Sequence, residues 1–137
     1  MKKIKKASCI LAVVLAIPTS VMASTQSSYS FSFPDYTGAV GSLRWTKSTQ
    51  IVTSNGKGAF VQPQYAVHST NYFLAASQNI TDRATDIVTT AYISKKPFTF
   101  LPSYGGSGTT YYMGGYPDSN YPYWASYIAN GTYGFNN

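Results

Sequence analysis

SYSFSF, residues 28–33, is the stretch that decides the fold class of this chain. Its serines alternate with Tyr29, Phe31 and Phe33. Because successive side chains of a β-strand point to opposite faces, this period of two gathers the aromatic rings on one face and the hydroxyls on the other. The stretch therefore predicts a half-buried strand, and Pro34-Asp35 predicts its end.

Strand-like segments recur through the rest of the chain, separated by turn residues. β-Branched and aromatic residues favour strands in the segments 42–48, 71–77, 87–93, 109–116 and 123–129. No long stretch repeats apolar residues at helical spacing. The sequence therefore predicts an all-β protein, a small antiparallel β-sandwich or barrel-like sandwich.

Asn55-Gly56 is the clearest turn signal in the chain. This dipeptide tolerates the positive φ angles of a tight hairpin turn, so it predicts a hairpin between Ile51-Val52 and residues 59–61. Pro63 then predicts the end of the second strand or a place at a sheet edge, because proline cannot donate a ladder hydrogen bond.

The first residues have the three-part layout of a secretory signal peptide. Four lysines precede an uncharged apolar run at 7–17, and Val21-Met22-Ala23 offers a small-residue cleavage pattern. The run is shorter than the roughly 20 residues of a membrane span, and no later stretch is long enough to be one. We expect a signal peptide at 1–23, a flexible tail at 24–28, a single β domain at 29–137, and a secreted protein without a membrane span.

The charge of the chain belongs largely to that leader. The full sequence has 10 Lys and Arg against 4 Asp and Glu, and removal of the four leader lysines leaves six cations and a net charge of +2. Only Lys95-Lys96 are adjacent, whereas nucleic-acid binding needs clustered cations, so we expect no nucleic-acid partner. The one cysteine, Cys9, also lies in the leader, so the mature domain has no disulfide.

Catalytic constellations are sparse, and the sequence predicts no enzyme. His68 is the only histidine, and no serine stands in a nucleophile elbow. Asp82 and Asp86 are the only close carboxylates, in a segment that is either a short helix or a loop, where capping and solvation explain them better than acid–base chemistry. We therefore assign no catalytic residue.

Metal and cofactor sites are equally sparse. One histidine, no glutamate in the mature chain and no remaining cysteine make a zinc site implausible. Asp118-Ser119-Asn120 is a fragment of a calcium loop without its bidentate glutamate, and it favours a plain turn. We expect neither a metal nor a cofactor.

Aromatic residues are the remaining source of chemistry. The chain has 13 Tyr, 7 Phe and 2 Trp, and residues 105–127 concentrate tyrosine among glycines. We expect 109–116 and 123–129 to be neighbouring strands joined by a turn at 117–120, with one face in the core and the other facing a partner. Tyrosine is favoured at binding surfaces, although aromatic pairs within a sheet also stabilise it. The candidate binding residues are Tyr111, Tyr112, Tyr116, Tyr121, Tyr123, Trp124 and Tyr127.

The layout of the chain resembles small cysteine-free exported proteins of Gram-positive bacteria. The resemblance lies in the leader, an early LRW strand at 43–45, the glycine-rich GSGTTYYMGGY at 106–116 and the closing YWASYIANGTYGF at 123–135. In architecture the chain is also similar to lactococcin-type bacteriocins. That similarity implies a β-sandwich acting at cell-wall precursors, and it transfers no functional residue.

The sequence thus predicts a secreted, non-enzymatic β-sandwich protein that binds at the cell envelope. Its candidate partner is a cell-wall glycan or surface polymer, since the tyrosine cluster is accompanied by Ser, Asn and Gly loops and few charges. Two alternatives stay open: a bacteriocin-like antimicrobial protein, and a structural component of an extracellular matrix or surface coat.

Overall fold

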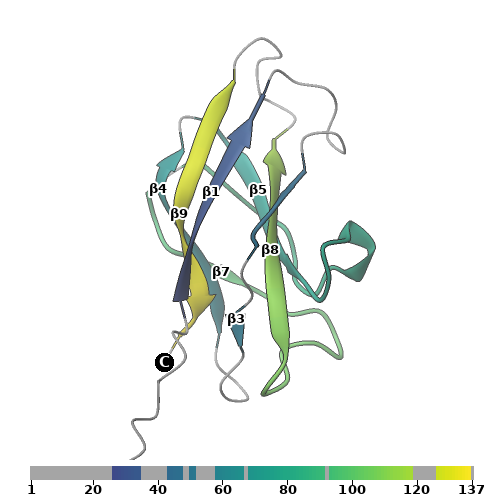
Figure 1. The fold of residues 1–137 in the computed structure, drawn as a ribbon. Coiled ribbons are helices and arrows are strands. Elements are labelled where there is room, and N and C mark those ends of the chain that lie inside the picture. The colour runs from purple at the N-terminus through teal and green to yellow at the C-terminus, as the bar shows by residue number, and fades with distance from the viewer. Residues whose placement is uncertain are drawn as a thin grey trace, which may run out of the picture.

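The chain folds as an all-β sandwich, as the sequence predicts (Figure 1). A computed structural model describes residues 26–34, 43–47, 50–51, 58–66, 68–91, 93–118 and 126–136. Strands dominate these residues, and one short 3₁₀ helix, η1, accompanies them. The elements are β1 (Gln26–Phe33), β2 (Arg44–Trp45), β3 (Gln50–Ile51), β4 (Ala59–Ala66), β5 (Thr70–Ala75), η1 (Ile80–Asp82), β6 (Val88–Thr90), β7 (Lys96–Phe98), β8 (Thr110–Pro117) and β9 (Tyr127–Phe135).

Two antiparallel sheets form the layers. The first has the order β1-β9-β4-β7, and β9 is its central strand because it pairs along its length with both β1 and β4. The second has the order β2-β8-β5-β6, with β3 also paired to β8. Among the described residues, no helix is long and apolar enough to cross a membrane.

The alternation at the start of the domain builds one wall of the core. Tyr29, Phe31 and Phe33 are buried and the intervening serines are exposed, as predicted. β1 ends at Phe33, directly before the proline, and it begins at Gln26, within the predicted tail. The Tyr29 ring packs edge-on against that of Tyr72 of β5, in the other sheet, at 5.5 Å between centroids.

The predicted C-terminal hairpin is wrong. β8 pairs with β2, β3 and β5, whereas β9 belongs to the other sheet between β1 and β4. The two strands face each other across the core, and the Tyr111 ring of β8 lies 6.4 Å from that of Phe135 of β9. Because the two strands lie in opposite sheets, each strand turns its aromatic face into the same core from its own side.

The predicted hairpin at Asn55-Gly56 is also wrong in its pairing. β3 pairs with β8 and β4 pairs with β9 and β7, so the strands that flank the turn lie in different sheets. Residues 52–57 lie outside the described part of the chain. Pro63 does not end β4. It lies beyond the three residues of β4 that pair with β7 and next to a register shift in the pairing with β9. A missing backbone N–H is tolerated at such a position.

The other two strand predictions and the helix prediction have mixed outcomes. Segment 71–77 is a strand as far as Ala75, the end of β5, and all six residues of β5 are buried. β5 lies between β8 and β6 in its sheet. In the described part of segment 87–93, the short β6 is the one strand. Asp82 ends η1, which Asn79 caps by accepting a hydrogen bond from the Thr81 N–H, while Asp86 accepts one from the Thr99 N–H outside any helix. The two carboxylates therefore share no helix face.

Two phenol hydroxyls are buried next to each other in the core, in a geometry that gives neither of them a well-formed hydrogen bond to a described residue. The Tyr29 and Tyr72 hydroxyls make no hydrogen bond within the part of the chain that the structure describes. Burial raises the pKa of both groups above the ordinary value of 10.0, and the neighbouring Tyr72 adds to the shift in the pKa of Tyr29. Each hydroxyl is thus a cost of folding that a phenylalanine would avoid.

We expect Tyr29→Phe and Tyr72→Phe to leave the free energy of unfolding at pH 7 unchanged or slightly higher. Above pH 10 the unfolded chain ionises these phenols while the folded chain keeps them protonated, so stability falls as pH rises through 10 and beyond. The double variant should show a shallower alkaline fall. Urea midpoints at pH 7 and pH 11 measure both effects. A clear loss of stability at pH 7 would show that the hydroxyls do have a stabilising partner.

Candidate functional site

The structure divides the predicted tyrosines between two environments. Tyr111 and Tyr127 point into the core, with 1% and 6% of their surfaces exposed. Tyr112 and Tyr116 are half-buried and lie on the opposite, outward face of β8. The remaining three predicted residues, Tyr121, Tyr123 and Trp124, lie outside the described part of the chain.

Tyr112 and Tyr116 belong to a larger aromatic cluster on the outside of the second sheet. We call this cluster the outer aromatic face, and it consists of Trp45, Phe73, Tyr112 and Tyr116. The Trp45 ring meets the Phe73 ring edge-on at 5.4 Å, and the Phe73 ring lies 6.3 Å from that of Tyr116. Three strands, β2, β5 and β8, therefore contribute to one surface.

Gly114 makes the close packing of this face feasible. It pairs with both Trp45 and Phe73 in the register of the sheet. A Cβ atom at Gly114 would lie 2.5 Å from Phe73 Cζ, so any side chain there would displace the ring. Phe73 consequently lies flat over the glycine and is fully buried, with half-buried Trp45 and Tyr116 beside it.

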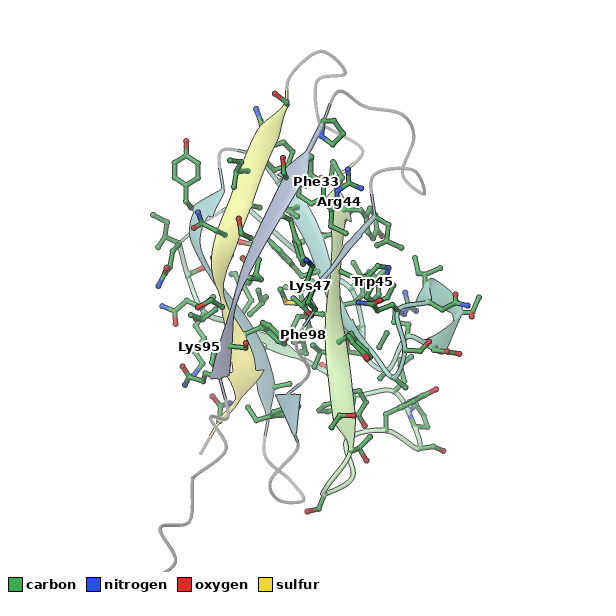
Figure 2. The ribbon with its side chains drawn as sticks, in the orientation of Figure 1. Phe33, Arg44, Trp45, Lys47, Lys95 and Phe98 are labelled. Atoms are coloured by element: carbon green, nitrogen blue, oxygen red, sulfur yellow. The ribbon has the colours of Figure 1, made fainter. Side chains whose placement is uncertain are left out.

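Hydrogen bonds around Thr46 hold Trp45 in place. The Thr46 N–H donates to Met113 O at 2.9 Å, and the Met113 N–H donates to Thr46 Oγ1 at 3.0 Å, which extends the β2–β8 pairing by one residue. Gln78 Nε2 donates to Thr46 O at 3.0 Å, so the segment before η1 lies alongside the face. Figure 2 shows Trp45 on the side of β8 that η1 occupies. The chain at Trp45 is thus held by Met113 of β8 on one side and by Gln78 on the other.

Polar groups accompany the rings. Asn71 lies directly across from Tyr116 and is buried, and its Oδ1 accepts a hydrogen bond from the Thr89 hydroxyl. None of the four aromatic residues, Asn71 or Thr89 carries a charge at neutral pH. The nearest charged group along β2 is Arg44, which turns to the other side and donates to Ser32 O at 2.9 Å. The residues of the face are therefore uncharged and largely apolar, an amide and a hydroxyl lie at its border, and the exposed Lys47 follows two residues after Trp45.

A separate groove lies where β1, β4 and β9 come together. It has a volume of about 390 Å³, and its described lining is Ser32, Tyr65, His68, Ser126, Tyr127 and Ile128. Tyr65 and Ile128 are 54% and 48% exposed there. His68 packs edge-on against the Tyr127 ring at 5.1 Å, and the Tyr127 hydroxyl is 2.8 Å from Thr70 Oγ1. His68 is thus placed against an aromatic ring at the rim of this groove.

Within the described ranges, no three His, Cys, Asp or Glu side chains gather as a metal site would require.

The sequence predicts two of the four residues of the outer aromatic face, Tyr112 and Tyr116, as binding residues. The alternating segment around Trp45 and the apolar segment around Phe73 predict core positions for both residues. Period-two patterning does not show which face of a strand meets the core when both faces are apolar, so it does not identify the outer face. A usable signal is Gly114-Gly115 within a strand, because a strand glycine often marks a place where another group approaches closely.

The chain matches no family model, no curated protein and no solved structure in the comparisons made with each.

Proposed function

We propose that this is a secreted, non-enzymatic protein that binds a cell-wall glycan or another surface polysaccharide through the outer aromatic face. The observation that carries the proposal is the packing of Trp45 and Tyr116 against a buried Phe73 on the outside of a sheet, with Tyr112 on the same face of β8. Half-exposed aromatic rings on a flat support are the surface that the apolar C–H faces of sugar rings stack on.

The rigidity of the face supports a binding role. The backbone at Trp45 is fixed by the ladder that Thr46 extends, and Tyr116 stands beside the Phe73 ring, which is fully buried and packed closely against Gly114. A ligand that stacks on these rings need not order them first, which lowers the conformational entropy cost of binding. Asn71 and Thr89 offer hydrogen-bonding groups at the border, which suits sugar hydroxyls.

The chemistry of the face also fits a neutral polymer. Its residues provide apolar rings, an amide and a hydroxyl, without a carboxylate–histidine pair for proton transfer. A neutral sugar needs no counter-charge, and uncharged aromatic surfaces bind such rings without the desolvation cost of an ion. These features favour binding over catalysis.

The proposal predicts that the mature chain, residues 24–137, is retained on purified cell wall or on an insoluble polysaccharide. Combining Trp45→Ala, Tyr112→Ala and Tyr116→Ala should lower retention at least about tenfold, because each stacked ring contributes about 0.5–1.5 kcal/mol. A sedimentation assay with quantified supernatant measures this, and circular dichroism checks that the variant is folded.

The matched control is Tyr65→Ala, which removes an exposed tyrosine away from the outer aromatic face. It should leave retention unchanged. Failure of the unaltered protein to bind any of the polymers would refute the proposal. Loss of binding in Tyr65→Ala, with normal binding by the triple variant, would move the site to the groove and equally refute its placement on the outer aromatic face.

A further inference from the structure

β1 is an edge strand with one open side. It pairs with β9 over eight residues, and no described strand pairs with its other side. Arg44 Nε reaches Ser32 O from that other side. Because the backbone groups of a strand point alternately to its two neighbours, the N–H and C=O groups of Ser28 and Ser30 point the same way as those of Ser32, away from β9.

A slot runs along this open side. It has a volume of about 260 Å³, and its described lining is Ser28–Phe31 from β1 and Trp45, Thr46 and Lys47 from β2 and the residues after it. Both walls consist of consecutive residues, so the walls are the edges of two strands from different sheets. Figure 2 shows Lys47 between β1 and β8. We call this feature the β1–β2 slot.

The two ends of the β1–β2 slot differ. Its upper end lies towards Ser32 and its lower end towards Ser28. At the upper end the two sheets approach closely, because the Phe31 ring lies where a Cβ of Gly115 would be, 2.7 Å from the nearest ring atom. Arg44 closes this end by its hydrogen bond to Ser32 O. At the lower end, towards Ser28, no described strand pairs with the side of β1 that faces away from β9.

The charge of the slot is positive. Lys47 is exposed at its rim and Arg44 stands at its closed end, while the described lining contains no carboxylate. A chain segment that enters the slot would therefore meet cations on the β2 side and, on the β1 side, backbone groups that no described strand pairs with. Both features select for an extended backbone that carries a negative charge.

We propose that the β1–β2 slot binds an extended peptide segment bearing a carboxylate, which adds to the edge of β1 as a further strand. Its backbone pairs with the N–H and C=O groups of Ser28 and Ser30. Its carboxylate lies beside Lys47, and the neighbouring apolar side chain packs against the half-buried Trp45. The slot shares Trp45 with the outer aromatic face, but its ligand chemistry, an acidic extended backbone, differs from that of a neutral polysaccharide.

A second copy of the chain is a poorer occupant than such a peptide. Antiparallel pairing of β1 with its counterpart would be two-fold symmetric, and each copy would bring the same residues to the shared seam. Arg44 and Lys47 of both copies would then stand along one seam with no carboxylate from either described lining to balance them. An acidic peptide supplies the balancing charge.

The test uses the mature chain and a fluorescent heptapeptide of alternating threonine and valine with a central aspartate. We expect saturable binding by fluorescence polarisation, and a weaker signal for the matched peptide with a central lysine. Ser30→Pro should lower affinity at least about tenfold, because it removes an edge N–H and places a ring where the added strand would lie. Ser30→Ala keeps the N–H and should bind as the unaltered chain does.

Lys47→Glu provides a second test that does not depend on how proline is accommodated. The residue is exposed, so the variant should fold, and it should reverse the preference between the aspartate and lysine peptides. Equal binding of both peptides by the unaltered chain and by Lys47→Glu would refute the proposal. So would unchanged binding by a folded Ser30→Pro variant, absence of peptide binding, or a dimer in solution that Ser30→Pro abolishes.

Discussion

Gly131→Ala is expected to lower the free energy of unfolding by about 3 kcal/mol or more, at the upper end of the cost of overpacking a tight site. A Cβ at Gly131 would lie 2.3 Å from Gln62 O and 2.8 Å from Pro63 Cα. Both are backbone atoms of β4 at its register shift, so no rotamer change relieves the clash. Since β9 is the central strand of its sheet, its displacement also disturbs the pairing with β1.

Urea denaturation followed by circular dichroism measures this loss, and Gly106→Ala is the matched control. At Gly106 the nearest atom to an added Cβ is Thr109 Oγ1 at 3.8 Å, an ordinary contact. The control should unfold at the same urea concentration as the unaltered chain. If Gly131→Ala unfolded there too, the pairing of β9 with β4 at this point would be wrong.

Phe73→Ala is expected to cost about 3–5 kcal/mol, the range measured when a buried aromatic ring is deleted. Phe73 is fully buried although it points away from the main core, because Trp45, Tyr116 and Gly114 surround its ring. Its removal leaves a cavity under the outer aromatic face. Trp45 then loses its edge-on partner, so glycan retention should fall with stability.

The companion variant Phe73→Leu separates these two effects. Leucine fills much of the same volume and should cost less stability than alanine, so the sheet stays folded under assay conditions. Retention should still weaken, since the ring that positions Trp45 and Tyr116 is absent. A folded Phe73→Leu variant that binds as the unaltered chain does would show that the support under the face does not matter for binding.

Local patterns in the sequence are enough to identify strands but not their partners. The alternation at 28–33 predicts both β1 and its buried face, because side-chain direction in a strand is a local property. The partner of a strand is a property of the whole core. Asn55-Gly56 suits a hairpin turn, yet β3 and β4 separate into different sheets, each pairing with strands from the last third of the chain.

The site is predictable to the extent that it depends on composition. Tyr112 and Tyr116 are among the candidates because tyrosine is concentrated at 105–127. Their separation from Tyr111 and Tyr127 follows from strand alternation and from the placement of β9 in the other sheet, which no local pattern encodes. Trp45 joins them only because β2 pairs with β8 at Gly114.

The most direct test of the outer aromatic face is the fluorescence of Trp45 alone. The chain has two tryptophans, so Trp124→Phe leaves Trp45 as the single reporter. Titration with soluble fragments of a polysaccharide that retains the protein should change Trp45 emission in a saturable way. Adding Tyr116→Ala should weaken the apparent affinity several-fold. Fragments that bind by calorimetry while Trp45 emission stays constant would place the ligand elsewhere and contradict the proposed function.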